Sequence, residues 1–92
     1  MKKAAVHGTH PDIINRLRRS EGHLRRIIGM LEENRGCLDV AQQLHAVESA
    51  IGAAKKVLIH DHIDHCLEKA VGSTSAKAGA SIDEFKEITK YL

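Results

Sequence analysis

A long stretch without proline, Leu38 to Val71, constrains the fold of this chain more than any other feature of the sequence. Its apolar residues recur at steps of three and four, the spacing that places side chains on one face of an α-helix. The members of this row are Val40, Leu44, Val47, Ile51, Ala54 and Leu58. Further alanines and valines widen the apolar face, so the stretch predicts one long helix that packs against more than one neighbour.

A second helix is predicted before this stretch, from Thr9 to about Glu33. Thr9 is the expected N-cap, and Pro11 falls in the first turn, where its missing N–H is no loss. Asp12 lies near the positive end of the helix, where a carboxylate is favourable. The expected buried row of this helix comprises Ile13, Leu17, Leu24, Ile27, Ile28 and Leu31.

The segment between the two helices, residues 34–36, contains a stop signal. Gly36 is suited to the left-handed conformation that ends many helices. Two long helices joined by so short a turn must be antiparallel neighbours.

After the long helix, the small-residue stretch of residues 72–80 predicts a flexible loop. Ser81 and Glu84 then form a capping-box pattern, which predicts a short terminal helix beginning there. The sequence shows no strand pattern. The expected fold class is therefore all-α, an antiparallel two-helix hairpin plus a short C-terminal helix.

Ninety-two residues with 42% hydrophobic and 28% charged residues describe at most one domain. We expect residues 1–8 to be a flexible N-terminal arm and residues 9–92 to form a single helical domain. A hairpin of this length buries little apolar surface by itself, which favours a homo-oligomer. No apolar stretch is long enough for a membrane span and no apolar core follows the basic start, so the expected location is cytoplasmic.

Cys37, His62 and Cys66 are the candidate metal ligands. A cytoplasmic chain keeps its thiols reduced, so cysteines there are ligands or reactive groups more often than disulfides. His62 and Cys66 lie one helical turn apart and can point at the same spot. Cys37 lies 62 − 37 = 25 residues before His62, which is about 37 Å along a straight helix. One straight chain cannot close that triangle.

Two arrangements bring the three ligands together. The helix breaks near Gly52 and folds back, or the third ligand comes from a second copy of the chain that lies antiparallel. We favour the second arrangement, because Ala50, Ala53 and Ala54 are strong helix formers and one glycine costs only about 1 kcal/mol in a helix. The sequence therefore predicts a homodimer with two equivalent sites that share ligands between chains.

Two thiolates and one imidazole form a soft donor set. The expected order of preference is Cu(I), then Zn(II), then Ni(II) or Co(II), because nickel and cobalt usually recruit more nitrogen and oxygen ligands. His60 and His65 flank the site and are alternative ligands. The second nitrogen of a metal-bound imidazole needs a partner, which Glu84 or Glu87 of the terminal helix could supply. Taken singly, each of these residues is as readily explained as an ordinary core or surface residue.

The first 35 residues carry eight Lys or Arg against four acidic residues, a net charge of +4, although the whole chain is only +2. The basic row on the first helix consists of Arg16, Arg19 and Arg26, with His23 in step and Arg18 and Arg25 adjoining it. Such a row is usually just a solvated face, but an oligomer multiplies it into a surface that can neutralise several phosphates. Because the chain has almost no aromatic residues to stack on unpaired bases, double-stranded DNA is the expected nucleic-acid partner.

From His10 to Val71 the chain resembles the CsoR/RcnR/FrmR family of small all-helical bacterial repressors. The pieces that carry the resemblance are NRLRRSEGHLRRI, GCLDVAQQLHAV and DHIDHC. The resemblance implies a dimeric four-helix bundle and a disc-like homotetramer, a dimer of antiparallel dimers. It also implies that the protein binds operator DNA without a helix-turn-helix and releases it when its effector binds.

The resemblance also indicates the effector. Copper(I) sensors of the family are similar to this chain in having Cys, His and Cys at the positions of Cys37, His62 and Cys66. Nickel or cobalt sensors have a histidine in place of Cys66, and formaldehyde sensors have a proline in place of Lys2. Persulfide sensors keep both cysteines and lack the histidine between them. His62 therefore favours a Cu(I)-responsive repressor that releases operator DNA on metal binding.

For DNA binding, the resemblance places Arg16 at a DNA-contacting position. Glu48 stands where many members of the family have a basic residue, and Lys55 and Lys56, two turns on, are expected to compensate. The DNA-binding residues expected in all are Arg16, Arg18, Arg19, Arg25, Arg26, Lys55 and Lys56.

Three alternative functions remain open. The first is a persulfide- or thiol-redox-responsive repressor that uses the two cysteines, and the second is a Ni(II)- or Co(II)-responsive repressor of the same fold. The third is a copper-buffering protein that does not bind DNA. No constellation of acid, base and nucleophile is present, so we do not expect an enzyme.

Overall fold

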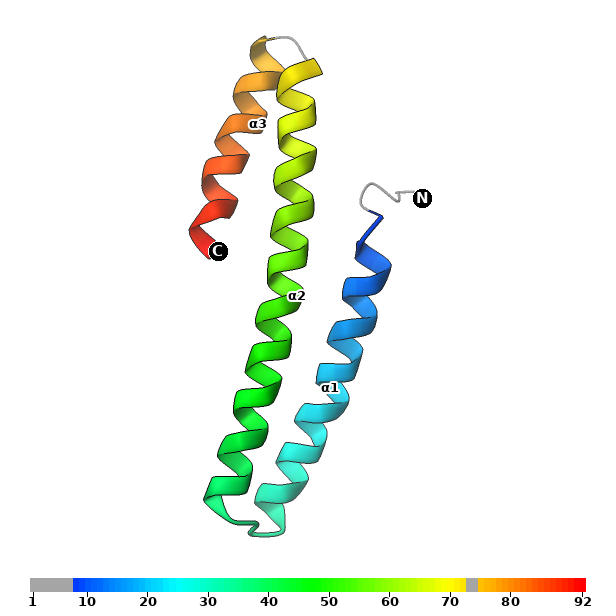
Figure 1. Cartoon of the computed structure of the whole chain (residues 1–92), viewed down its shortest axis with the longest axis vertical. Coiled ribbons are helices and arrows are strands. Elements are labelled where there is room, and N and C mark those ends of the chain that lie inside the picture. Colours follow the sequence, from blue (N-terminus) through cyan, green and yellow to red (C-terminus); the bar gives the residue numbers. More distant parts are fainter. Residues whose placement is uncertain (1–7, 73–74) are drawn as a thin grey trace. The chain divides into compact units, whose positions relative to one another are not determined.

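The computed structural model describes residues 8–72 and 75–92, without the side chains of residue 66, residues 69–72 and residues 75–81. The elements along the chain are α1 (His10–Glu32), α2 (Cys37–Gly72), α3 (Ser75–Ile88) and the short 3₁₀ helix η1 (Thr89–Tyr91) (Figure 1). The all-α prediction is confirmed over these ranges. None of the helices searched there is both long and apolar enough to cross a membrane. Of the predicted flexible arm, residues 1–7 lie outside the described residues.

The chain forms two compact units. Residues 11–54 make up the first unit, which holds most of α1 and the N-terminal half of α2. Residues 55–92, with the segment that ends at His10, make up the second unit, which holds the C-terminal half of α2, α3 and η1.

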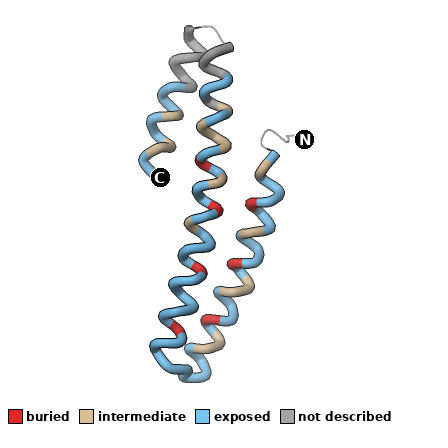
Figure 2. Tube along the Cα trace, in the orientation of Figure 1, coloured by how far each residue is buried: buried red, intermediate tan, exposed pale blue. Residues whose placement is uncertain are grey.

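In the first unit, α1 and α2 pack antiparallel and bury one narrow row of side chains each (Figure 2). Both rows step by seven residues, so each helix offers its neighbour one fully buried residue every two turns. The two rows, termed the seam, are Ile13, Ser20 and Ile27 on α1 and Val40, Val47 and Ala54 on α2. Ile27, Val40 and Val47 form its core cluster, against which Met30 packs.

The buried row predicted on α1 is correct only for Ile13 and Ile27. Its other members are between 39% and 57% exposed. A single helical neighbour covers only the residues that point at it, and positions displaced from the seam by one or four residues point to the flank instead. The exposed leucines and isoleucines of this unit, termed the outer apolar residues, are Ile14, Leu17, Leu24, Ile28 and Leu31 on α1 and Leu38, Leu44 and Ile51 on α2.

The turn between α1 and α2 is closed by Asn34, not by Gly36. Asn34 has a φ of 57°, and no described glycine has a positive φ. The amide of Arg35 donates to the carbonyl of Met30 at 2.9 Å, and the amide of Asn34 donates to the carbonyl of Leu31 at 3.1 Å. These two bonds form a Schellman motif with Asn34 as its left-handed residue. Asparagine takes this position because its short polar side chain tolerates the left-handed region better than other non-glycine residues do.

Gly36 has another role, as the N-cap of α2. Its carbonyl accepts the amide of Val40 at 3.1 Å, which is the first hydrogen bond of that helix. At the start of α1, Thr9 precedes the first helical residue as predicted. Its hydroxyl, however, is buried and has no hydrogen-bond partner in the described part of the chain. The predicted side-chain cap by Thr9 is therefore wrong.

α2 continues through Gly52 without interruption. The alternative in which the helix breaks there and folds back is therefore excluded. The flanking alanines explain the continuity, since their helix propensity outweighs the cost of one glycine.

α3 begins six residues earlier than the predicted terminal helix, at Ser75 instead of Ser81. The capping box predicted at Ser81 and Glu84 is wrong, since both positions lie inside α3. The predicted loop is also wrong over residues 75–80, which are helical, while residues 73–74 lie outside the described residues. Alanine is the strongest helix former and recurs at Ala76, Ala78 and Ala80. This run of small residues therefore favours a helix over a flexible loop.

The left-handed turn residue leads to a stability prediction. Asn34→Val should lower the free energy of unfolding by about 1–2 kcal/mol, because a β-branched side chain is strained at a positive φ. Asn34→Gly removes that strain and should leave stability close to the wild-type value. Urea unfolding followed by circular dichroism at one fixed protein concentration measures the free energy of unfolding of both variants. Equal midpoints for the two variants would show that residue 34 does not need the left-handed conformation.

Candidate functional site

A basic hollow of about 230 Å³ opens beside the seam. Residues of α1 that recur at steps of three and four form its wall, and two alanines of α2 form its floor. This arginine hollow is lined by Arg16, Arg19, Ser20, His23 and Arg26 of α1 and by Ala50 and Ala53 of α2. The predicted basic row is therefore a concave surface, and it stays open because the facing α2 side chains are methyl groups.

The arginines of the hollow are held in different ways. Nε of Arg16 donates to Oδ2 of Asp12 at 2.8 Å, one turn earlier on α1. The guanidinium of Arg26 reaches back along the helix, so that its Nη1 lies 4.0 Å from where a Cβ on Gly22 would be. Arg19 and Arg26 form no ion pair with any described residue. The hollow thus presents two uncompensated positive charges beside one oriented by a carboxylate.

His23 connects the hollow to α2. Its Nε2 donates to Oε1 of Gln43 at 2.7 Å, a hydrogen bond between the two helices. From the sequence, His23 had only a marginal place in the basic row, and Ser20, Gln43, Ala50 and Ala53 were missed. His23 could have been ranked higher because it lies four residues after Arg19 and three before Arg26. The α2 residues could not be found that way, since nothing in their spacing distinguishes a floor from an ordinary helix face.

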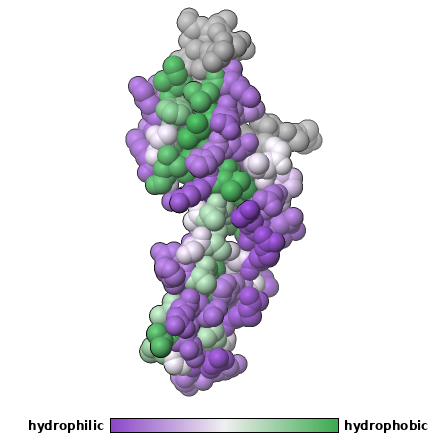
Figure 3. All heavy atoms as spheres, in the orientation of Figure 1, coloured by the Kyte–Doolittle hydropathy of each residue, from purple (hydrophilic) through white to green (hydrophobic). Residues whose placement is uncertain are grey.

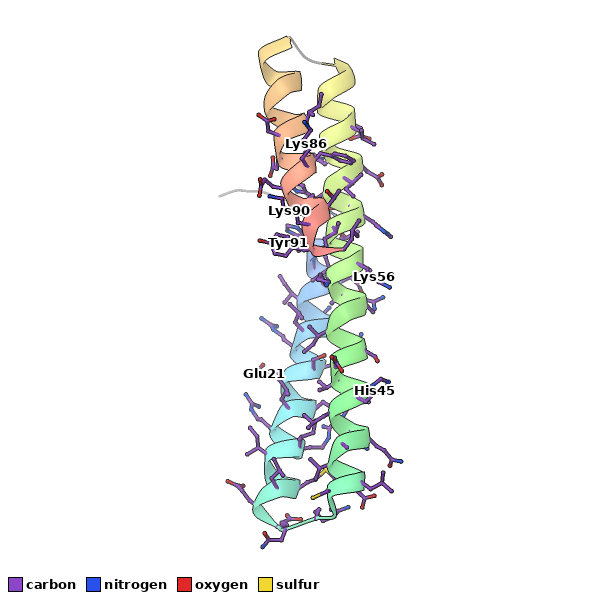
Figure 4. All side chains as sticks on the ribbon, turned by 90° about the vertical axis from the view of Figure 1, so that its left-hand side faces the viewer. Glu21, His45, Lys56, Lys86, Lys90 and Tyr91 are labelled. Atoms are coloured by element: carbon purple, nitrogen blue, oxygen red, sulfur yellow. The ribbon has the colours of Figure 1, made fainter. Side chains whose placement is uncertain are left out.

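The other residues predicted to bind DNA lie outside the hollow. Arg18 is exposed, and Arg25 places Nη2 3.2 Å from Oε2 of Glu21 in an exposed ion pair. Glu21 projects from α1 in Figure 4. Lys55 and Lys56 are exposed on the part of α2 in the second unit, where Lys56 points away from α3 (Figure 4).

The second unit contains the histidine of the predicted metal site. Nε2 of His62 on α2 lies 2.8 Å from Oε2 of Glu84 on α3, and the His62 side chain is only 21% exposed. Glu87, the other candidate partner, instead places Oε2 3.1 Å from Nζ of Lys90. Of the two glutamates, Glu84 is therefore the one that contacts His62. Figure 3 shows apolar side chains gathered along this pair of helices, with hydrophilic ones on both sides.

The cysteines lie at different places along α2. Cys37 is its first residue, exposed and with a free thiol. Cys66 is part of the same helix, one turn after His62, but its side chain lies outside the described residues. His60 is exposed and His65 is half-buried. Among the residues that could be searched, no three His, Cys, Asp or Glu side chains gather into a metal site.

Comparison with known proteins gives consistent matches. A family model described as a metal-sensitive transcriptional repressor matches residues 9–91. The copper-sensing transcriptional repressor CsoR of Mycobacterium ulcerans is 40% identical over 78 residues, which are 85% of this chain and 65% of that protein. CsoR of Bacillus subtilis is 39% identical over 80 residues, or 85% of this chain and 79% of that protein. The chain thus spans slightly less than two thirds of the mycobacterial relative.

A solved structure is also similar. It is the nickel-responsive transcriptional regulator InrS, with a TM-score of 0.79 and 31% identity over 90% of this chain and 92% of that one. The family model and the relatives agree with the resemblance seen in the sequence, and this family is one of repressors, not of enzymes. The chain therefore belongs to the metal-sensitive transcriptional repressor family.

Proposed function

We propose that this chain is a Cu(I)-responsive, cytoplasmic transcriptional repressor. Its metal-free form binds operator DNA, and Cu(I) binding lowers its affinity for that DNA. The observation that carries the proposal is the 2.8 Å approach of Oε2 of Glu84 to Nε2 of His62, because a carboxylate beside the imidazole is the usual surrounding of a metal-ligating histidine.

The donor set fits Cu(I). With Nε2 of His62 engaged by Glu84, Nδ1 is the nitrogen we assign to the metal. Cys66 follows one turn later on the same helix, so the histidine and the second thiolate can meet at one point. Thiolates select soft cations such as Cu(I) over nickel and cobalt. When bound, Cu(I) supplies a link between these two ligands and Cys37.

The third ligand comes from a second chain in this proposal. Because α2 does not fold back at Gly52, we assign Cys37 of one protomer to the site formed by His62 and Cys66 of another. The outer apolar residues supply a reason for the two chains to associate, since an exposed row of leucines and isoleucines is unfavourable in water. A dimer with two such sites follows from the symmetry of the contact, and the family resemblance implies a tetramer made of two such dimers.

The arginine hollow supplies the DNA-binding surface in this proposal. Arg19 and Arg26, which lack acidic partners among the described residues, can each neutralise a backbone phosphate. An assembly repeats the hollow, and several weak phosphate contacts then add to a useful affinity. Linkage makes the effect reciprocal, so operator DNA must weaken Cu(I) binding by the same factor as Cu(I) weakens DNA binding.

Nickel is the second candidate effector, because the similar solved structure is of a nickel-responsive regulator. Ni(II) would need additional nitrogen or oxygen ligands beside the two thiolates. His60 and His65 lie close enough along α2 to be considered for that role. Zn(II), Co(II) and a reaction of the two thiols with persulfide are further alternatives that the same experiment separates.

The effector is tested by DNA release. Purified protein bound to its own upstream promoter DNA is titrated anaerobically with Cu(I), and Ni(II), Zn(II), Co(II) and persulfide are tested in parallel. We expect release at about one Cu(I) per chain, consistent with a coupling of about 1–3 kcal/mol. Cys37→Ala and His62→Ala should still bind DNA but no longer release it, whereas His45→Ala should behave as wild type. Release by nickel or persulfide alone would reject copper, and failure of the apo protein to bind DNA would reject the repressor.

The role of Glu84 is tested against its neighbour Glu87. Glu84→Gln removes the carboxylate that contacts His62 and should lower Cu(I) affinity about tenfold or more, the usual effect of losing such a partner. Glu87→Gln is the matched control, since Glu87 pairs with Lys90 instead, and it should leave the affinity unchanged. Competition with a Cu(I) chelator measures both. Equal affinities for the two variants would mean that Glu84 does not support a metal ligand.

The role of the hollow in DNA binding is tested by salt dependence. The double variant Arg19→Ala/Arg26→Ala should bind operator DNA more weakly at all salt concentrations. The slope of log affinity against log salt should fall by about 0.9 for each phosphate that the variant no longer neutralises. Arg35→Ala removes a charge that lies outside the hollow and 3.9 Å from Glu33, and should change the slope little. An unchanged slope in the double variant would place the DNA contacts elsewhere.

A further inference from the structure

The hydrogen bond between His23 and Gln43 fixes where the first proton of this imidazole lies. An amide oxygen only accepts, so Nε2 of His23 carries the proton that it shares with Oε1 of Gln43. Neutral His23 then has an unprotonated Nδ1, which can accept a hydrogen bond but cannot donate one. A second proton turns Nδ1 into a donor and gives the ring a positive charge.

The surroundings of His23 determine what such a charge could bind. On α1, the charged residues that share the hollow are Arg16, Arg19 and Arg26, all positive. On α2, the residues that face it are Gln43, Ala50 and Ala53, none of which titrates. Among the residues that the structure describes, no carboxylate lines the hollow.

Two acidic residues nearby already have partners. Asp12 bonds to Arg16. Glu33 lines a neighbouring hollow with Gln43, and its Oε1 lies 3.9 Å from Nη1 of Arg35. A protonated His23 therefore adds charge to a positive concave surface, and an external anion is what would balance it.

We propose that the arginine hollow is a binding site for one phosphate group and that His23 makes this binding proton-linked. The anion lies against Arg19 and Arg26, and the protonated ring supplies a further charge-assisted donor through Nδ1–H. Anion binding then takes up at most one proton from solvent, onto Nδ1 of His23. The shared chemistry is a phosphate oxyanion, from the DNA backbone or from free inorganic phosphate.

The DNA-backbone assignment rests on the proposed function, whereas the anion site stands on the geometry of the first unit alone. Phosphodiesters carry one negative charge throughout the pH range of the experiment. A change of their affinity with pH therefore comes from a titrating group of the protein. Inorganic phosphate itself titrates near neutral pH, so the non-titrating sulfate ion is the better probe of the free protein.

The experiment measures sulfate affinity of the full-length, metal-free protein between about pH 5.5 and about pH 7.5 by titration calorimetry at constant ionic strength. A charge-assisted hydrogen bond gained at low pH should tighten sulfate binding about tenfold over this range. His23→Gln keeps an amide that can still donate to Gln43 but cannot take the second proton, so its affinity should not depend on pH. Circular dichroism confirms that each variant is folded.

The matched control is His45→Gln. His45 lies on α2 within the same unit and projects away from α1 (Figure 4), so this variant should keep the wild-type dependence on pH. A pH dependence that persists in His23→Gln would overturn the proposal. Sulfate affinity that is unchanged in Arg19→Ala/Arg26→Ala would overturn it as well.

A second arm identifies the occupant by repeating the pH series with duplex DNA of unrelated sequence. If the wild type binds this DNA more tightly at low pH and His23→Gln does not, a backbone phosphate occupies the hollow. If sulfate binding is proton-linked but DNA binding is not, the site binds a free anion and the DNA-backbone assignment is overturned. Failure to bind operator DNA at any pH would instead reject the repressor function and leave the sulfate result standing.

Discussion

The width of the seam between α1 and α2 determines what the rest of the first unit can do. Each helix buries one position in seven, and the facing positions of the two rows are equally distant from the turn. At 100° per residue, the arginines of the hollow lie on one side of this row on α1 and the outer apolar residues on the other. A wider interface within the chain would have covered one of these flanks. The narrow seam therefore leaves one basic surface and one apolar surface on the same hairpin.

In the second unit, the contact between His62 and Glu84 depends on how few residues separate the end of α2 from the start of α3. In antiparallel helices, residues equally far from the turn face each other, and both residues lie eleven positions from residue 73 (73 − 62 = 11 and 84 − 73 = 11). With the predicted loop of residues 72–80, the midpoint between the two helices would have been residue 76 instead of residue 73. Glu84 would then have faced residue 68. The sequence offered Glu84 and Glu87 as alternative partners for His62, but the loop predicted with them would have placed Glu84 away from His62.

The sequence predicted the helices more reliably than their environment. Periodicity was sufficient for α1, and periodicity with the absence of proline was sufficient for α2. The net charge of the first 35 residues was sufficient to find the basic row. Periodicity could not separate the seam from the outer apolar residues, because the outer residues are at least as apolar as the seam, which contains Ser20. Only the number of neighbours distinguishes the two rows. Gly36 was predicted to adopt the left-handed conformation, but Asn34 adopts it instead. Both residue types tolerate that conformation, so the sequence did not decide between them. The link from His23 to Gln43 was not predictable, because it depends on the register of two helices.

Cys37 and the arginine hollow are connected within the first unit through a short part of α2. Gln43, which holds His23, lies 43 − 37 = 6 residues after Cys37, and the alanine floor of the hollow follows on the same helix. If Cys37 held a metal as proposed, that bond would act on the first turn of this helix. The seam that holds α2 against α1 is one residue wide, so a small shift of α2 disrupts few apolar contacts. Such a shift would change the distance between Gln43 and His23 and move the alanines beneath the arginines, so metal binding at Cys37 would act on the proposed phosphate site.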